Sequence, residues 1–598
     1  MSVKPASILL FAALAAVVSA TNAVAQGIVK GNSYIPASSV EQPMDIGVRA
    51  HTYVQLLSGQ GEGRVSPNGG LGPKNGLTPA QVRSAYNLPS AGGSKIIAIV
   101  DAYDDPNALA DFNTFSAQYG LPQETSTSAT ATTNKVFQVV YASGTKPGTD
   151  STGGWELEEA LDIEWAHAMA PSAKIVLVEA ATNAYATLFT AVDTATNYVD
   201  GNGTKVAEVS CSWGGSEFSG ETSDDVHFTS ASVTYFVSAG DSGSPAHYPS
   251  SSPYVVSCGG TTLNTTAAGA FQTEVAWNSG GGGPSTYETT PSYQSGVASR
   301  VGAARGTPDV AFVANPTTGV SVYDSYPQTG VGAGWQLVGG TSVSSPAIAG
   351  VANVAATSAG SFPLGSQALL TTIYKNLAST NFRDITSGNN GYAAQAGWDF
   401  VTGVGSPLGL IGFQKVVAAP SLTAVSPGSA TVGSAAITGS VTGTGFLSGA
   451  TVNLNGTALA TVYVSSTQLT ISIPAADLTT AGAATITAVN PGSSNSNSLT
   501  FTVNNPVPTV TSLSPNTAKH GGASFTLTIT GTHFLSGSVV SWTSGKTTTV
   551  LPIKSTTSTT ITVTVTSSLI ATAGTATVTV ANPTPGGGAS SPVTFTIQ

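Results

Sequence analysis

The sequence predicts a parallel α/β sheet with helices on both faces, followed by two all-β sandwiches. Apolar segments typical of buried strands alternate with helix-like segments in the earlier part of the chain. In the later part, short Thr- and Val-rich strands with Gly and Pro turns repeat. The 598 residues are too many for one hydrophobic core, so several domains are expected.

Residues 1–25 have the layout of a signal peptide. Lys4 supplies the positive start, Ile8 to Val18 form the apolar run, and Ala23-Val24-Ala25 is a small-residue cleavage site. The apolar run is too short to span a bilayer, and no later stretch reaches about 18 apolar residues. We therefore expect a secreted protein that does not span a membrane, and a monomer. Residues 26–76 are Gly-rich with weak periodicity, and we interpret them as a short leader or extended N-terminal arm.

Residues 77–417 are predicted to form one α/β domain. TPAQVRSAYNLP (78–89) has a Thr cap and a Pro at the first helical position. SKIIAIVDAYDDPN (94–107) is typical of a buried parallel strand that ends in an acidic loop. Helices are expected at 155–170 and 186–199, between the strand-like segments KVFQVVYA, KIVLVEA, KVAEVSCSWGG, VTYFVSAGDSG and YVVSCGG. Functional loops should gather at the carboxyl ends of these strands.

Two sequence repeats follow Ala418, over residues 419–504 and 505–598. SPGSATVG…ITGSVTGTGFLSGATV in the first is echoed by SPNTAKHGGASFTLTITGTHFLSGSVV in the second. Both repeats resemble the immunoglobulin-like IPT/TIG modules of secreted and surface proteins. They contain no convincing catalytic constellation, so we expect them to serve as spacers or to attach the protein to a cell-surface or matrix ligand.

The composition excludes some classes of partner. Charged residues make up 8% of the chain, and 30 acidic against 19 basic residues give a net charge of −11. The sequence contains no basic stripe, so we do not expect a nucleic-acid partner. A sparsely charged protein has few ion pairs to lose in acid, which is compatible with tolerance of low pH. The two cysteines, Cys211 and Cys258, lie in apolar strand-like runs and are interpreted as buried small side chains.

VGGTSVSSPAIAGVAN (338–353) is the strongest single motif. Its Gly-rich turn delivers Ser342 directly into a helix of small residues. At a helix N-terminus the dipole favours negative charge and backbone N–H groups can face an oxyanion, which suits a nucleophile. Alone, the motif is equally compatible with an ordinary N-cap serine.

The predicted helix over 155–170 offers a proton acceptor. Glu158 and Asp162 are four residues apart and therefore share one helical face. Two carboxylates in a partly buried site raise one pKa and can share a proton, so the pair can act as a base in acid. Because other acids flank this pair, a solvated acidic face is the favoured interpretation when the helix is considered alone: Glu156, Glu159 and Glu164.

Together these motifs resemble the sedolisins, serine-carboxyl peptidases with a subtilisin-like fold. Subtilisins share the Ser342 motif, but none of the six histidines here lies in the His-Gly-Thr type of motif that they need. ELEEALDIEWAHAMAPSAKIVLVEA is similar to the sedolisin acidic helix, and SAGDSG (238–243) to the oxyanion-site loop. The resemblance implies that Glu158 is the base, Asp162 its partner and Asp241 the oxyanion donor.

The resemblance covers about residues 77–412 and extends to further positions. SWGG resembles the strand edge on which peptide substrates lie, which implies substrate contacts at Ser212, Trp213 and Gly214. RGTPDVAFVANPTTGV (305–320) also fits the family. Asp101 lies where some members have an extra acid behind the catalytic pair. Sedolisins usually have a long folded prodomain, whereas only about 50 residues separate the predicted signal peptide from the catalytic region here.

The resemblance also implies one structural Ca²⁺ in NFRDITSGNNGYAAQAGWDFVTGVGSPLG (381–409). Hard oxygen donors suit this ion. The implied ligands are two carboxylates and three backbone carbonyls: Asp384, Ile385, Gln395, Gly397 and Asp399. Gln395 stands where the family usually has Gly.

We therefore expect a secreted, acid-acting serine endopeptidase that hydrolyses polypeptides through an acyl-enzyme. Two alternatives remain open at this point. One is a neutral subtilisin-type protease whose base is His167 or His247. The other is a catalytically inactive surface adhesin or cell-wall binding protein that works through its sandwiches.

Overall fold

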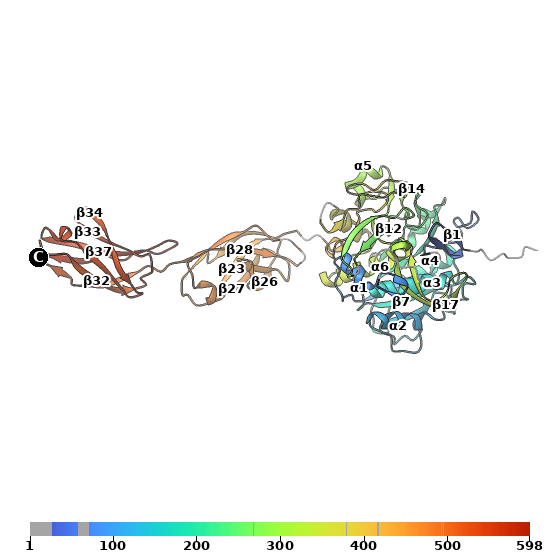
Figure 1. Cartoon of the computed structure of the whole chain (residues 1–598), viewed down its shortest axis with the longest axis horizontal. Coiled ribbons are helices and arrows are strands. Elements are labelled where there is room, and N and C mark those ends of the chain that lie inside the picture. Colours follow the sequence, from blue (N-terminus) through green and yellow to red (C-terminus); the bar gives the residue numbers. More distant parts are fainter. Residues whose placement is uncertain are drawn as a thin grey trace, which may run out of the picture. The chain divides into compact units, whose positions relative to one another are not determined.

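The computed structural model describes residues 27–57, 71–266, 268–377, 380–415, 418–491, 493 and 495–598. The predicted signal peptide over residues 1–25 lies outside the described residues. The chain divides into two compact units, Met1–Lys415 and Val416–Gln598 (Figure 1). The first is an α/β unit and the second is all-β.

A mostly parallel sheet forms the centre of the α/β unit. Its strand order is β13-β12-β10-β8-β5-β7-β6, and β16 also pairs with β12. Every pair in this sheet is parallel except β12 with β13. The strands are β5 Ile96–Ala102, β6 Phe137–Tyr141, β7 Lys174–Ala180, β8 Val206–Cys211, β10 Thr234–Ser238, β12 Val256–Thr265, β13 Phe271–Ala276 and β16 Val310–Val313.

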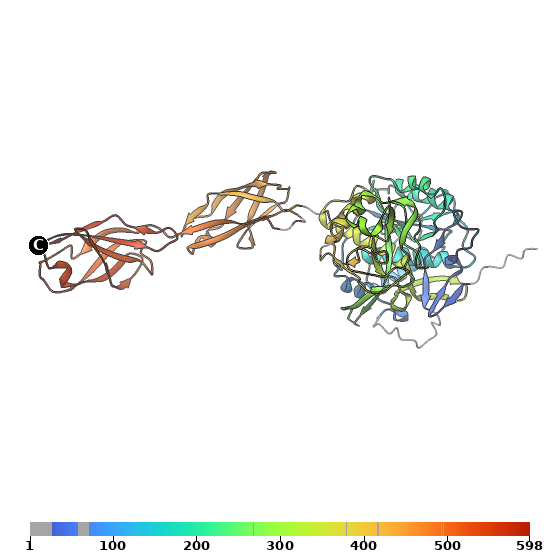
Figure 2. The ribbon, with the colours of Figure 1, turned by 90° about the horizontal axis from the view of Figure 1, so that it is seen from above.

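Helices cover both faces of this sheet, as the sequence predicts (Figures 1 and 2). Alternate residues of β5 point to opposite faces. Ile97 and Ile99 belong to the apolar cluster that contains α2, α3, α6 and α7, whereas Ala98 and Val100 belong to the cluster that contains α4. Asp101 therefore lies on the face covered by α3 and α6. The helices are α2 Ala108–Tyr119, α3 Gly154–Met169, α4 Tyr185–Asn197, α6 Thr341–Ala359 and α7 Ser366–Lys375.

The first helix of the predicted domain begins as its sequence indicates. α1 spans Pro79–Ala85, and Thr78 and Gln81 form a reciprocal capping box at its start. Several short elements of this unit lie outside the large sheet: β11 His247–Tyr248, β14 Gly283–Thr289, α5 Ala298–Val301, β15 Ala304–Thr307, β19 Phe382–Arg383 and β20 Ser406–Pro407.

The described part of the segment between the predicted signal peptide and α1, residues 27–57 and 71–78, is built into the α/β unit. β1 (Ile28–Lys30), β2 (Ser33–Ile35) and β4 (Gln55–Leu57) form a sheet with β18 (Gly332–Gly339) and β17 (Val320–Gln328). A further short strand, β3 (His51–Thr52), pairs with β9 (Trp213–Ser216). Sequence periodicity gave no sign of this, because each of the four strands has only two or three residues.

Two β-sandwiches make up the second unit, and their strand orders correspond, apart from the short extra strand β38 of the second, which pairs with β37. The first pairs β21-β23-β27-β26 with β22-β29-β28-β24-β25, and the second pairs β30-β32-β36-β35 with β31-β39-β37-β33-β34. This correspondence is the structural counterpart of the sequence repeat. The strands of the first are β21 Ser421–Ser426, β22 Ser429–Thr431, β23 Ile437–Thr444, β24 Thr451–Leu454, β25 Thr457–Ala458, β26 Ala460–Ser465, β27 Gln468–Ile473, β28 Gly482–Val489 and β29 Leu499–Asn504. Those of the second are β30 Thr509–Ser514, β31 Thr517–Ala518, β32 Phe525–Thr532, β33 Val539–Ser544, β34 Thr547–Leu551, β35 Ile553–Thr556, β36 Thr560–Val565, β37 Gly574–Asn582, β38 Gly588–Ala589 and β39 Val593–Ile597.

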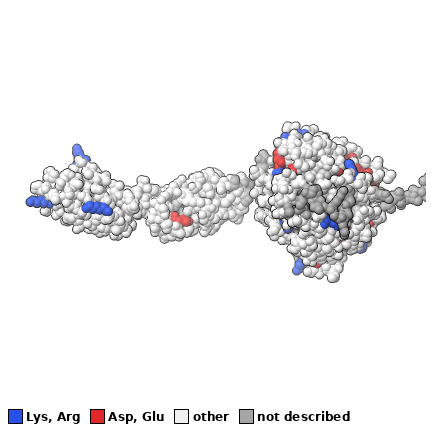
Figure 3. Space-filling view, in the orientation of Figure 1, with Lys and Arg blue, Asp and Glu red and all other residues white. Residues whose placement is uncertain are grey.

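Charged side chains are sparse on the surface. On the face drawn in Figure 3, Lys, Arg, Asp and Glu are scattered singly over the α/β unit and are fewer still over the sandwiches. Many acids are instead buried inside the α/β unit. Cys211 and Cys258 are both buried and free, as the apolar character of their strands predicts.

Candidate active site

Ser342 is the second residue of α6 and is fully buried. Its hydroxyl donates a 3.4 Å hydrogen bond to the carbonyl oxygen of Ser212. Pro346, one turn later, has no N–H to donate to the Ser342 carbonyl, and the Ser212 hydroxyl lies 3.4 Å from that oxygen. The N-terminal turn of α6 is thereby tied to the segment joining β8 and β9.

Gly340, which caps α6, has φ of 110°, a conformation that favours glycine. A Cβ on this residue would collide with the carbonyl oxygen of Tyr53 and would lie 2.8 Å from Oδ2 of Asp241. The carbonyl of Tyr53 and the carboxyl of Asp241 therefore converge on the turn that delivers Ser342.

α3 is buried along its whole length, which the sequence interpretation of a solvated acidic face did not anticipate. All five of its acids have no solvent exposure: Glu156, Glu158, Glu159, Asp162 and Glu164. The helix packs against β5 and β7 of the sheet and against α2, α6 and β17, and most of its apolar residues belong to one buried cluster. The solvated-face interpretation is therefore wrong for this helix.

Burial and mutual repulsion set the ionisation of the acids around Ser342. The pKa of Glu158 is raised well above its ordinary value, first by burial and then by the nearby carboxylates of Asp162 and Asp101. The nearby Ser342 hydroxyl opposes this rise, although among the described residues neither carboxyl oxygen of Glu158 has a hydrogen-bond partner. Burial also raises the pKa of Asp162, and the Ser212 hydroxyl opposes that rise. Such a group of acids retains protons to higher pH than isolated carboxyls do.

Asp101 lies behind this pair, at the carboxyl end of β5. Burial, Asp162 and Glu179 raise its pKa well above the ordinary value. The structure thus brings Glu158, Asp162 and Asp101 into one electrostatic group beside Ser342.

Asp241 follows β10 and faces the start of α6. Its Oδ1 accepts hydrogen bonds from the backbone N–H of Thr341 at 2.8 Å and from its hydroxyl at 2.9 Å. Burial raises the pKa of Asp241 to about 8, although these two hydrogen bonds lower it. Its Oδ2 is buried and has no hydrogen-bond partner. A protonated Oδ2 would donate a hydrogen bond to an oxygen placed beside it.

β9 contains the predicted substrate contacts Trp213 and Gly214, and Ser212 precedes it. The Trp213 indole is buried and donates a 2.7 Å hydrogen bond to the Val100 carbonyl, which leaves its backbone available for strand pairing. β3 of the N-terminal segment already pairs with this strand: His51 with Gly214, and Thr52 with Trp213. This contribution is not predictable from the sequence, because a two-residue strand leaves no periodic signal.

The two histidines that could serve a subtilisin-type mechanism bond to groups other than Ser342. His167 Nε2 lies 2.8 Å from the Pro122 carbonyl, and burial lowers its pKa to about 4. His247 Nδ1 lies 2.7 Å from the Tyr53 hydroxyl. Neither arrangement supplies Ser342 with an imidazole base.

A loop at residues 384–399 contains the predicted calcium ligands. Gly397 N–H donates to Asp384 at 2.9 Å, and Gln395 N–H donates to Asp399 at 2.9 Å, so both carboxylates hold the same short loop. The Arg300 guanidinium donates hydrogen bonds to the backbone carbonyls of Ala396 and Trp398. Carboxylate and carbonyl oxygens are hard donors of the kind that Ca²⁺ prefers. Within the described residues, no cluster of three or more His, Cys, Asp or Glu side chains forms a metal site.

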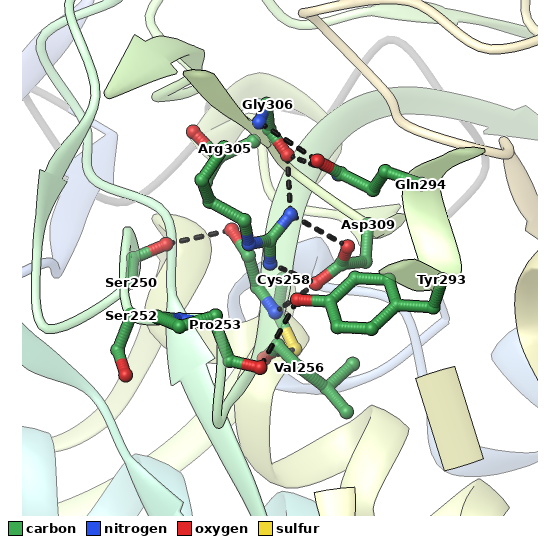
Figure 4. A network of polar contacts seen from close by, with 12 residues as sticks. Ser250, Ser252, Pro253, Val256, Cys258, Tyr293, Gln294, Arg305, Gly306 and Asp309 are labelled. Carbon is green, nitrogen blue, oxygen red and sulfur yellow. Dashed lines mark hydrogen bonds and ion pairs between the residues drawn. The ribbon is translucent and has the colours of Figure 1, made fainter. Parts of the chain in front are cut away.

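A buried ion pair supports the strand under α6 (Figure 4). Arg305 donates to both carboxylate oxygens of Asp309, and Asp309 also accepts from Ser257 N–H at 2.8 Å and from the Tyr374 hydroxyl at 2.8 Å. Arg305 lies over the Tyr293 ring at 5.5 Å. This network fixes β16 to β12, and α6 packs on both strands.

In the part of the chain that the structure describes, no helix has both the length and the apolar character needed to cross a membrane.

Two family models match this chain. The model described as the Subtilase family matches residues 148–405, which include Glu158, Asp162, Asp241 and Ser342. The model described as the IPT/TIG domain matches residues 508–597, the second sandwich.

Kumamolisin from Bacillus sp. (strain MN-32) is 33% identical over 390 residues, or 58% of this chain and 65% of kumamolisin. Sedolisin from Pseudomonas sp. (strain 101) is 29% identical over 425 residues, or 62% of this chain and 68% of sedolisin. The chain thus spans just under two thirds of the length of kumamolisin. The solved structure of Pseudomonas sedolisin, a serine-carboxyl proteinase, complexed with two molecules of pseudo-iodotyrostatin has 29% identity and a TM-score of 0.47; the match covers 56% of this chain and 95% of that one. Residues 148–405 are therefore similar to the Subtilase family, with kumamolisin and sedolisin as relatives, and residues 508–597 are similar to the IPT/TIG domain.

Proposed function

We propose that this protein is a serine-carboxyl endopeptidase that hydrolyses polypeptides in acid through an acyl-enzyme. The similarity to sedolisin and kumamolisin supports a peptide-bond hydrolase. One observation carries the finer assignment: a buried glutamate, Glu158, has the Ser342 hydroxyl and the carboxyls of Asp162 and Asp101 as its electrostatic neighbours. This arrangement provides a nucleophile and a base without an imidazole.

In the first step, Glu158 takes the proton of the Ser342 hydroxyl while that oxygen attacks the scissile carbonyl carbon. Burial, together with Asp162 and Asp101, keeps the pKa of Glu158 high, so this carboxyl can hold the transferred proton and return it to the leaving amine. The C–N bond breaks, and an ester links Ser342 to the amino-side product. Water then attacks the ester with the same acids transferring protons, and the serine is regenerated.

Asp241 stabilises the negative oxygen of each tetrahedral intermediate. With a pKa of about 8, this carboxyl is protonated in acid and neutral solution, so its unpartnered Oδ2 can donate a hydrogen bond. The Ser342 backbone N–H, at the positive end of α6, supplies the second donor. Loss of one such donor lowers turnover by about 10²–10³ in comparable sites.

The decisive experiment compares Ser342→Ala, Glu158→Gln and Asp241→Asn with the wild type on denatured protein between pH 3 and 8. We expect a wild-type maximum below pH 6 and a loss of at least about 100-fold in kcat for each variant. Circular dichroism of each variant controls for folding. A folded variant that keeps wild-type turnover would remove that residue from the mechanism.

We further propose secretion of the mature protein and one structural Ca²⁺ held by Asp384, Asp399 and the carbonyls of Ile385, Gln395 and Gly397. The ion would stiffen the loop that β19 and β20 flank, and it takes no part in the steps above. Residues 419–504 are proposed to be a second IPT/TIG-like copy, because their strand order matches that of residues 505–598. Both sandwiches would attach or space the catalytic unit.

A further inference from the structure

The chain's own residues 50–56 run in extended form past Ser342. Tyr53 N–H donates a 3.3 Å hydrogen bond to the Ser212 carbonyl, and the Tyr53 carbonyl accepts a 3.2 Å hydrogen bond from Ser342 N–H. The N–H of Tyr53 is therefore held by Ser212, just before β9, and its carbonyl is held by the backbone of Ser342, the proposed nucleophile.

Strand pairing continues on both sides of this point. Before Tyr53, residues 51–52 pair with 213–214 of β9 in antiparallel register. After it, Gln55 pairs with Gly339 and Leu56 with Val338 of β18, the strand that leads into α6. This is the geometry of β-strand addition, in which main-chain hydrogen bonds bind an extended peptide irrespective of its sequence. The Tyr53–Val54 peptide bond lies between the two pairings, at Ser342.

A third contact holds the amino side of the segment. Ala50 N–H donates to the Asn183 carbonyl at 2.9 Å, and the Asn183 side-chain amide donates to the Ala50 carbonyl at 3.0 Å. The segment thus lies between β9 on one side and the start of α4 on the other. Such binding from two sides defines a groove rather than a single strand edge.

The Tyr53 carbonyl lies among the groups that would stabilise an oxyanion. Its oxygen and the unpartnered Oδ2 of Asp241 both crowd the position that a Cβ on Gly340 would occupy. With the Ser342 N–H as its donor on the other side, this carbonyl has the environment expected for a scissile carbonyl.

The Tyr53 side chain occupies a pocket that matches it. The residue is 5% exposed, and its hydroxyl lies 2.7 Å from Nδ1 of His247. Gly214 makes room for the ring, since a Cβ there would come within 2.8 Å of the Tyr53 hydroxyl oxygen. A cavity of about 240 Å³ adjoins the ring and is lined in part by Asp241, His247 and Gly214.

We propose that Tyr53–Val54 is a peptide bond that the enzyme cuts in its own chain, and that its pocket selects tyrosine on the amino side of the bond it cuts. His247 and Gly214 are the specificity-determining residues: the imidazole recognises the phenol, and the missing side chain admits the ring. This inference rests on the proposed function and extends it to a substrate preference.

The reaction balances as an ordinary hydrolysis. The Ser342 oxygen bonds to the Tyr53 carbonyl carbon, the bond from that carbon to the Val54 nitrogen breaks, and the serine proton passes through Glu158 to that nitrogen. Water then adds to the ester and releases Tyr53 as a carboxylic acid. Before the cut, residues 50–56 fill the groove, so an external substrate must compete with them.

The first experiment follows the full chain. Wild-type and Ser342→Ala proteins are purified near pH 8 and shifted to pH 4, and their N-termini are sequenced over time. We expect a new N-terminus at Val54 in the wild type only, forming at a first-order rate that is unchanged over a tenfold range of protein concentration. A denatured protein substrate is assayed in parallel.

The parallel assay separates the two hypotheses. Hydrolysis of the added substrate without any cut after Tyr53 would overturn self-cleavage and leave the proposed function intact. No hydrolysis of either would overturn the proposed function itself. A first-order rate constant that rises in proportion to the protein concentration would mean that one molecule cuts another. That result would contradict cleavage of residues 50–56 by the active site of their own chain.

The second experiment tests the pocket with the peptide GVRAHTYVQLL, which copies residues 47–57, and with matched peptides carrying Phe or Ala in place of Tyr. We expect cleavage between Tyr and Val, with kcat/KM at least 10-fold higher for Tyr than for Ala. In His247→Phe the Tyr-to-Phe ratio should fall towards 1, through KM more than through kcat. Equal rates for the Tyr and Ala peptides, or an unchanged ratio in a folded, active His247→Phe, would overturn the assignment of the pocket.

Discussion

The carboxylate of Asp309 faces the guanidinium of Arg305 with both oxygens, at 2.9 and 2.6 Å, and neither side chain reaches solvent. The pair lies under α6, whose N-terminal turn presents Ser342. A buried ion pair of this kind contributes little net stability when intact, but the loss of one partner leaves an uncompensated charge in the core.

Asp309→Ala should therefore lower the free energy of unfolding of the α/β unit by about 3–5 kcal/mol. The matched control is the double variant Arg305→Met/Asp309→Leu, which removes both charges and should lose much less. Urea unfolding monitored by tryptophan fluorescence measures both. A single variant no less stable than the double one would contradict this account.

Stability should also fall as the pH rises from about 5 to 8. Burial raises the pKa of Glu156, Glu208 and Asp324 to about 8 each, above the values these acids have in an unfolded chain. The folded protein thus holds more protons than the unfolded one between those limits, and each group loses up to about 1.4 kcal/mol per pH unit. The stabilisation from these three carboxyls is fully present below the pKa that they have in the unfolded chain. It is lost as the pH rises through the pKa that they have in the folded protein.

Calorimetry should accordingly give a melting temperature at least about 10 °C higher at pH 4.5 than at pH 8. Glu156→Gln should flatten this dependence, because its buried carboxyl no longer ionises. Asp477→Asn, an exposed change in the first sandwich, should leave the slope as it is. A melting temperature that rises towards pH 8 would contradict the sign.

Asp101→Asn should shift the acid limb of the pH dependence of kcat/KM to lower pH. Asp101 is one of the carboxyls that raise the pKa of Glu158, so its removal lets the base ionise in stronger acid. A shift of about one pH unit is expected for a like-charge neighbour. Asp477→Asn again provides the control. A lower rate with an unmoved limb would indicate that Asp101 acts only structurally.

Removal of calcium should destabilise the α/β unit alone. EDTA is expected to lower its melting temperature by several degrees, and Ca²⁺ in excess over EDTA should restore it. In Asp384→Asn and Asp399→Asn the effect of EDTA should shrink, whereas Asp477→Asn, exposed in the first sandwich, should respond like the wild type. An identical melting curve with and without EDTA would count against the site.

The parallel sheet was predictable because its strands are long, apolar and buried on both faces, as in β5 and β7. Burial of α3 was not predictable from composition, because a helix with five acids among its 16 residues has the pattern of a surface helix. Only the resemblance singled out Glu158 and Asp162. The position of Tyr53 depends on backbone pairing with β9 and β18, which leaves no trace in residue type.

The sandwich unit differs from the α/β unit in its charges. Residues 416–598 contain one acidic residue, Asp477, and three basic ones: Lys519, Lys546 and Lys554. Among ordinary side chains only histidine changes its charge between pH 5 and 8, and this stretch contains two. The net charge of this stretch therefore changes little while the acidity around the molecule changes, and the attachment role proposed above would not depend on pH.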